Sequence, residues 1–69
     1  MTTYRSTICQ SVNLKTGVSR YYISKCDVFQ RVGPDEFHER NNMADTWECV
    51  WSETVRGVRR FYSTVVWSE

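Results

Sequence analysis

The chain has 69 residues and a mass of 8.2 kDa, which allows one domain with a small core and excludes a large catalytic domain with its own cofactor fold. Its net charge is only +1 and its aromatic content is 14%, a combination opposite to that of disordered chains. Nine Val, two Ile, seven Thr and ten aromatic residues dominate, whereas Ala and Leu occur once each. The composition therefore favours strands and excludes a helical bundle.

The first part of the chain predicts a β-hairpin. Residues 4–14 alternate between apolar and polar side chains, which is the pattern of a half-buried strand. Asn13 and Gly17 frame the following loop, because Asn bonds to nearby backbone and Gly supplies the positive φ that closes a hairpin. Residues 18–32 are again β-rich, but their apolar positions change parity midway. We therefore expect a bulge or a bend at residues 24–27.

The middle segment, residues 34–44, predicts either a short helix or an irregular loop. Gly33 and Pro34 end the preceding strand, and Pro34 followed by two carboxylates favours a helix start. Such a helix would place Phe37 on one face with Ala44. The Asn41-Asn42 pair weakens the helical pattern, so both alternatives stay open.

The last part predicts a second hairpin. Residues 45–55 alternate, and Arg56-Gly57 forms a tight turn before residues 58–67, which are apolar on both faces and therefore typical of a central strand. We expect a mainly β fold, or an α+β fold if the connection is helical. The expected sheet is small and antiparallel, with about four strands from two hairpins: 4–14 with 18–32, and 45–55 with 58–67. One domain spans residues 1–69. The apolar face expected on 45–55 is formed by Trp47, Cys49, Trp51 and Val55.

A shift of forty residues gives a weak self-match. It places Cys9 on Cys49, Gly17 on Gly57 and Tyr22 on Tyr62. The match indicates two hairpins of like design. A true duplication and the general likeness of Gly-turn hairpins are both open explanations.

Charge is segregated along the chain. Residues 1–34 carry five basic groups and one acidic group, residues 35–54 carry one and six, and residues 55–69 carry three and one. This segregation predicts either a sheet whose basic strands neighbour an acidic connection, or separate positive and negative patches that steer a partner.

Candidate catalytic and metal-binding residues are few. Cys9, Cys26 and Cys49 are odd in number and widely spaced, which favours free thiols packed as small hydrophobes in a cytoplasmic protein over disulfides or a zinc site. His38 lies among carboxylates, which is typical of a solvated surface residue. We therefore expect no enzymatic activity, no cofactor and no metal. Residues 1–10 lack the apolar stretch of a secretory signal, and no apolar run has the length of a membrane span.

The aromatic content predicts a protein-binding function. One short helix cannot cover a sheet with this much apolar surface, so we expect the surplus to meet another chain; that surplus is Trp47, Trp51, Phe61 and Trp67. A two-fold homodimer is the simplest arrangement. By size and by the lack of catalytic motifs alone, the chain also has the form common among phage- or mobile-element-encoded modulators and inhibitors that bind a host protein.

Nucleic-acid binding is the alternative function. Cations and aromatic rings interleave on two predicted strands, a pattern that lets rings stack on bases while cations meet phosphates. The residues concerned are Arg20, Tyr22, Arg59, Arg60 and Tyr62. The pI of about 7.7 argues against this alternative, because dedicated nucleic-acid binders are usually strongly basic.

Overall fold

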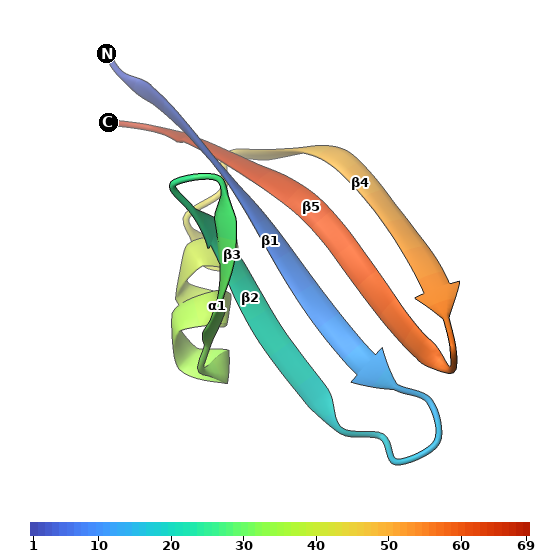
Figure 1. Ribbon diagram of the computed structural model, residues 1–69. Coiled ribbons are helices and arrows are strands. Elements are labelled where there is room, and N and C mark those ends of the chain that lie inside the picture. The colour runs from blue at the N-terminus through green and yellow to red at the C-terminus, as the bar shows by residue number, and fades with distance from the viewer.

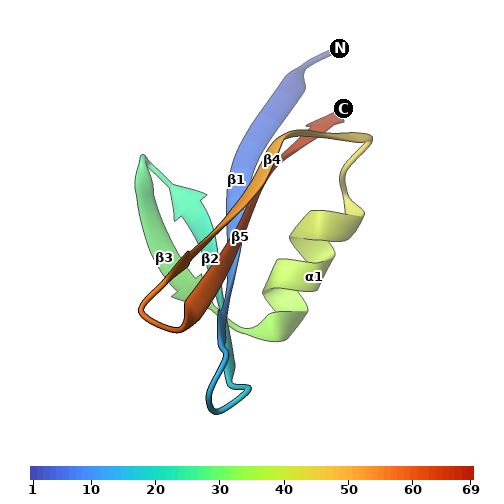
Figure 2. The ribbon, with the colours of Figure 1, turned by 90° about the vertical axis from the view of Figure 1, so that its right-hand side faces the viewer.

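A computed structural model describes all of residues 1–69 and shows one antiparallel sheet with a helix on one side (Figures 1 and 2). The elements are β1 (Thr3–Asn13), β2 (Ser19–Lys25), β3 (Val28–Val32), α1 (Pro34–Asn42), β4 (Thr46–Val55) and β5 (Val58–Ser68). The strand order is β3-β2-β1-β5-β4, so β1 and β5 join the two hairpins and bring the termini together (Figure 1). The prediction of a mainly β, antiparallel fold is confirmed.

The fifth strand exists because residues 18–32 reverse direction. Cys26 and Asp27 form the turn between β2 and β3, with φ angles of 52° and 65°. Positive φ at two successive residues gives a tight turn whose twist matches that of the flanking strands. β3 then pairs antiparallel with β2, with Ser24 opposite Phe29. The predicted bend at residues 24–27 is therefore a complete chain reversal.

The loop of the first hairpin uses the expected residues. The Asn13 side-chain oxygen accepts hydrogen bonds from the backbone N–H groups of Lys15 at 2.9 Å and Thr16 at 3.1 Å. Gly17 closes the loop at a φ of 77°, and Gly57 has a φ of 76° in the second hairpin. Both glycines thus hold a conformation that an L side chain would disfavour.

The forty-residue near-repeat has a counterpart in the order of four strands. It aligns β1 with β4 and β2 with β5, and the order β2-β1-β5-β4 sets the two hairpins side by side in the same sense. Cys9 is buried within β1, whereas its repeat partner Cys49 is exposed in β4. The repeat therefore corresponds to two adjacent Gly-turn hairpins of like arrangement, although the matched cysteines differ in environment.

The segment 34–44 forms a helix that covers part of one sheet face. Gly33 caps α1 in an extended conformation, Pro34 occupies the first turn, and two carboxylates lie near the positive end of the helix dipole. Phe37 packs into the core with Ile8, Ile23 and Val65. Eight of the 69 residues are buried, because nine helical residues cannot cover five strands. This helix is neither long nor apolar enough to cross a bilayer.

The three cysteines are free, but they do not share one environment. Cys9 is buried, as predicted, and lies in β1 opposite Tyr62. The prediction of a core position is wrong for Cys26 and Cys49, which are both exposed. Cys26 belongs to the β2–β3 turn and Cys49 to an irregular point of β4 with a φ of 51°, and neither position faces the core.

Candidate interaction surfaces

The sheet has two faces of different chemistry. The helix face is the side on which α1 lies, and its core residues include Ile8 and Val65. The open face is the opposite side, where Tyr22, Cys9 and Tyr62 are neighbours across β2, β1 and β5. Figure 2 shows α1 on one side of the sheet and β3 curving toward the other side. A partner can therefore meet two distinct surfaces.

A β-bulge separates two tryptophans that alternation assigns to one face. The pairing of β4 with β5 shifts by one residue between Glu48 and Trp51, where Cys49 has a positive φ. The extra residue reverses the direction of the following side chains. Trp47 consequently lies on the helix face and Trp51 on the open face. The prediction of one continuous apolar face on residues 45–55 is wrong for this reason.

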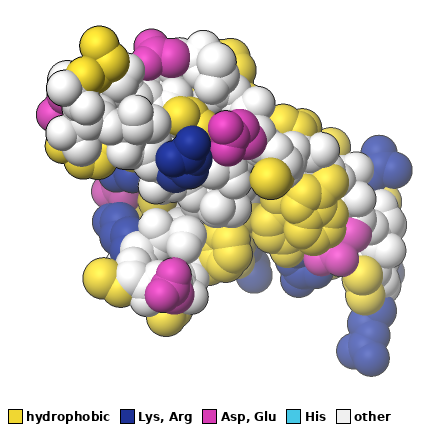
Figure 3. Space-filling model, turned by 90° about the horizontal axis from the view of Figure 1, so that it is seen from above, with side chains coloured by type: hydrophobic (Ala, Val, Ile, Leu, Met, Phe, Trp, Pro, Cys, Tyr) yellow, Lys and Arg dark blue, Asp and Glu magenta, His cyan; other side chains and the backbone are white.

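Helix α1 leaves the β4–β5 half of the helix face uncovered. A groove of about 530 Å³ lies there, lined by residues that include Phe37, Val50 and Phe61. Trp47, Val50 and Phe61 have exposed fractions of 50%, 69% and 44%. We call these three residues the helix-side patch. Figure 3, which views the molecule from above, shows a cluster of hydrophobic side chains toward the β4 side of the molecule, where both faces contribute exposed rings.

Trp47 and Trp67, the two predicted partner-binding tryptophans that lie on the helix face, differ in how far they pack against the rest of the chain. The Trp47 indole N–H donates a hydrogen bond to the Asn41 side-chain oxygen at 2.9 Å, which fixes the ring while half of it stays exposed. Trp67 is partly buried against the core, stacks on Tyr4 at a centroid distance of 5.6 Å, and has the Arg40 guanidinium 5.3 Å from its ring. Trp67 therefore serves the packing of the chain itself.

Aromatic rings and arginines gather on the open face. Trp51 stacks on Tyr62 with a centroid distance of 4.2 Å, and Phe29 approaches Tyr62 edge-on at 6.1 Å. A hollow of about 270 Å³ lies among Cys9, Tyr22, Phe29, Arg60 and Tyr62. We call the following residues the open-face array: Tyr22, Phe29, Trp51, Tyr62, Arg20, Arg31 and Arg60.

Four of the five residues proposed for nucleic-acid binding share the open face. Arg20 and Arg60 both pair with Ser11, and Tyr22 and Tyr62 both pair with Cys9, which makes two adjacent rows. Arg59 lies on the helix face, where its Nε donates to the Thr54 hydroxyl at 3.1 Å.

Sequence reasoning missed Phe29, Arg31 and the open-face position of Trp51. Residues 28–32 show no alternation of apolar and polar side chains, and this segment was not recognised as a separate strand, so no signal in the sequence indicated the face of Phe29 or Arg31.

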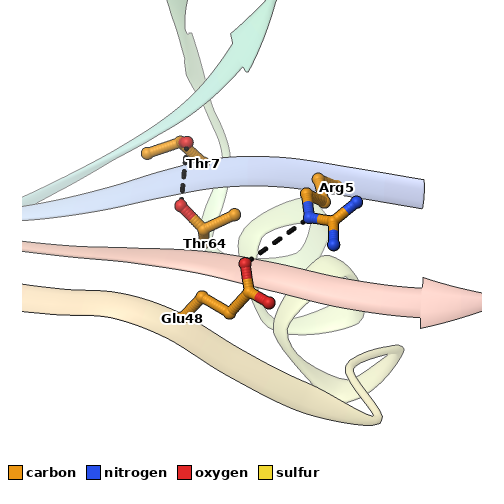
Figure 4. Close-up of polar contacts among 4 residues, drawn as sticks. All are labelled: Arg5, Thr7, Glu48 and Thr64. Carbon is orange, nitrogen blue, oxygen red and sulfur yellow. Dashed lines mark hydrogen bonds and ion pairs between the residues drawn. The ribbon is translucent and has the colours of Figure 1, made fainter. Parts of the chain in front are cut away.

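Three arginines of the open face are free of ion pairs. Arg5 is paired with Glu48, with 3.4 Å between Nε and Oε2, and the neighbouring Thr7 and Thr64 hydroxyls lie 3.2 Å apart (Figure 4). Arg20, Arg31 and Arg60, by contrast, make no ion pair. Their charge remains available to an anionic partner.

The centre of the open face holds two uncharged acidic groups. Burial raises the pKa of the Cys9 thiol above its ordinary value. Burial also raises the pKa of the Tyr62 hydroxyl, as do the nearby Cys9 and Glu53. The Tyr62 hydroxyl donates a hydrogen bond to Glu53 at 3.3 Å. Both groups are therefore neutral around pH 7, and the array presents rings and cations.

The remaining polar residues do not form a reactive cluster. No three His, Cys, Asp or Glu residues lie close enough together to hold a metal ion. His38 lies against the rings of Tyr21 and Phe37, at 5.8 and 5.6 Å, and makes no hydrogen bond to a carboxylate. The two surfaces thus offer apolar, stacking and cationic contacts. Comparison with protein-family models, curated proteins and solved structures gives no match for this chain.

Proposed function

We propose that this chain is a small non-enzymatic interaction module that binds protein through the helix-side patch, and that its first partner is a second copy of itself. The observation that carries the proposal is the exposure of Val50 and Phe61, which line one groove, together with the exposure of Trp47, which is hydrogen-bonded to the groove residue Asn41. Interface hot spots favour such aromatic anchors beside a pocket.

The thin core strengthens this proposal. Ile23 and Val65 are the only large side chains that are completely buried, whereas twelve large hydrophobic residues are exposed. Burying a large apolar side chain stabilises by roughly 1.5–3 kcal/mol. A partner on the patch therefore supplies burial that the nine residues of α1 cannot give. An interface of standard size, ~800 Å² on each partner, would cover about a sixth of the 4989 Å² surface.

Charge favours contact between faces over contact between strand edges. β4 is an edge strand, and two copies of β4 paired antiparallel about their midpoints would set Glu48 opposite Glu53 of the second copy. Like charges directly opposite each other destabilise a sheet. The helix-side patch has no such conflict among its three residues, and a two-fold axis needs only one self-complementary patch.

Sedimentation at micromolar concentration tests the proposal. We expect a dimer for the natural chain and a weaker dimer for Phe61→Gln. The dimer contains two copies of Phe61, so its dissociation constant should rise at least about 100-fold. Phe29→Gln is the matched control, because Phe29 has nearly the same exposed fraction, 45% against 44%, on the opposite face. A monomer at every concentration, or equal effects of the two substitutions, would contradict self-association through this patch.

A different protein is the alternative occupant of the patch. A modulator or inhibitor from a phage or mobile element would use the same groove to hold a host protein in the cytoplasm. In that case the chain stays monomeric alone, and Phe61→Gln weakens capture of the host protein while Phe29→Gln does not.

A further inference from the structure

We propose that the open face binds single-stranded nucleic acid, independently of the helix-side patch. The proposal rests on the open-face array, which lies on the side of the sheet that α1 does not cover (Figure 2). Three features of this face support binding: a ring surface for bases, cations for phosphates, and a charge distribution that the net charge conceals.

The ring surface crosses the sheet in one row. Register pairs connect Arg31 with Tyr22, Tyr22 with Cys9, Cys9 with Tyr62, and Tyr62 with Trp51. Adjacent strands lie ~4.8 Å apart, so this row crosses all five strands in ~20 Å. Tyr62 covers one side of the Trp51 ring, and half of Trp51 stays exposed. An exposed ring on a sheet is a platform on which any base can stack.

Arg20 and Arg60 flank this row and line two adjoining hollows, whereas Arg31 lies at the β3 end of the row. The hollow among Cys9, Tyr22, Phe29, Arg60 and Tyr62 continues into a second one of about 360 Å³, which Tyr22 and Arg60 also line together with Arg20. Arginine binds phosphate through its planar fork of N–H groups. Arg20, Arg31 and Arg60 are free of carboxylate partners and can therefore contact phosphates beside stacked bases.

The two sides of the molecule carry different charge, which removes the objection raised by the pI. Helix α1, on the side opposite the array, carries Asp35, Glu36 and Glu39 against one cation, Arg40, and Glu36 pairs with Lys25. The open face carries four arginines and two glutamates, and one of these glutamates pairs with Arg5. The near-neutral total is thus an average over a basic face and an acidic helix.

Single strands fit this surface better than an acidic protein does. A carboxylate-rich partner would use the three arginines but would leave the exposed rings of Phe29 and Trp51 without a role. Unpaired bases use both, since rings stack on bases while cations meet the backbone. A duplex hides its bases and should bind less tightly.

Fluorescence anisotropy with labelled oligo(dT) and oligo(rU) of about 20 nucleotides tests the proposal; this length exceeds the ~4–16 nucleotides that a small β domain contacts. Three phosphate contacts predict that affinity falls about 20-fold between about 50 and 200 mM salt. Trp51→Ala should weaken binding roughly 5- to 150-fold. Arg60→Gln should weaken binding and flatten the salt dependence by about one contact. Comparison of the affinities for oligo(dT) and oligo(rU) shows whether DNA or RNA is preferred.

Matched controls lie on the other face. Trp47→Ala and Arg59→Gln remove the same residue types from the helix face and should leave oligonucleotide affinity unchanged. Quenching of tryptophan fluorescence by oligo(dT) should largely vanish in Trp51→Phe, even where that variant still binds. Absence of binding at about 50 mM salt would overturn the proposal. Equal losses in Arg59→Gln and Arg60→Gln would do so too, as would polyglutamate binding as tightly as oligo(dT).

Discussion

At the residue scale, Ser6 shows that the core is not fully optimised. Its hydroxyl is buried at 8% exposure on the helix face and has no hydrogen-bond partner. An unpartnered buried hydroxyl loses its hydration without compensation. The nearby Thr7 and Thr64 hydroxyls, by contrast, bond to each other at 3.2 Å.

Ser6→Ala should therefore stabilise the fold by ~1 kcal/mol, which raises the melting temperature by roughly 4–8 °C. Thr64→Val is the comparison, because it removes the partner of the Thr7 hydroxyl and should lower the melting temperature. Thermal unfolding followed by circular dichroism measures both. A lower melting temperature for Ser6→Ala would show that the Ser6 hydroxyl has a partner after all.

Cys9 makes stability depend on pH in the alkaline range. Burial raises its pKa in the folded chain, while the unfolded chain keeps the ordinary value of 9.0. Above that pH the unfolded chain loses the proton first, so the free energy of unfolding should fall as pH rises. Urea midpoints between about pH 8 and 10 measure this slope. Cys9→Ala should flatten it, and an unchanged slope would assign the effect to another group.

At the scale of elements, the turns decide how much of the fold can be read from the sequence. The Asn13–Gly17 loop, the Gly57 turn and the helix start at Pro34 follow from residue types with strong backbone preferences. The Cys26–Asp27 turn and the Cys49 bulge do not, because both place non-glycine residues at positive φ. Those two features create β3 and send Trp51 to the open face. The residue types of the candidate sites could therefore be predicted from the sequence, but the sheet face on which each residue lies could not.

Glycine substitutions test the role of these turns. Gly57→Ala should destabilise the fold by ~1–2 kcal/mol, because its φ of 76° disfavours an L side chain although nothing lies within 4 Å of the added carbon. Gly33→Ala has equal space and an ordinary φ of −74°, so its loss should be smaller, at most ~1 kcal/mol, because the poorer helix N-cap is offset by the reduced freedom of the unfolded chain. Urea unfolding compares the two. Equal losses would contradict the assignment of strain to the Gly57 turn.

At the scale of the whole molecule, the chain is elongated, with extents of 44 × 22 × 20 Å, and its single short helix is too small to cover either face of the sheet completely. The composition predicted this surplus of apolar surface, but only the strand register divides it into two surfaces. The helix-side patch is apolar and suits a protein. The open-face array combines rings with unpaired arginines and suits a charged polymer. Binding at each surface can therefore be tested with substitutions on that surface and with control substitutions of the same residue type on the other.

The most direct test of the central claim is the dilution dependence of the indole N–H signals of Trp47, Trp51 and Trp67 in two-dimensional NMR spectra. Trp47 belongs to the helix-side patch, Trp51 to the open face, and Trp67 packs within the chain. Self-association through the helix-side patch predicts that the Trp47 signal moves on dilution while the Trp51 signal stays constant. A Trp47 signal that does not move, or movement of Trp51 alone, would contradict the account.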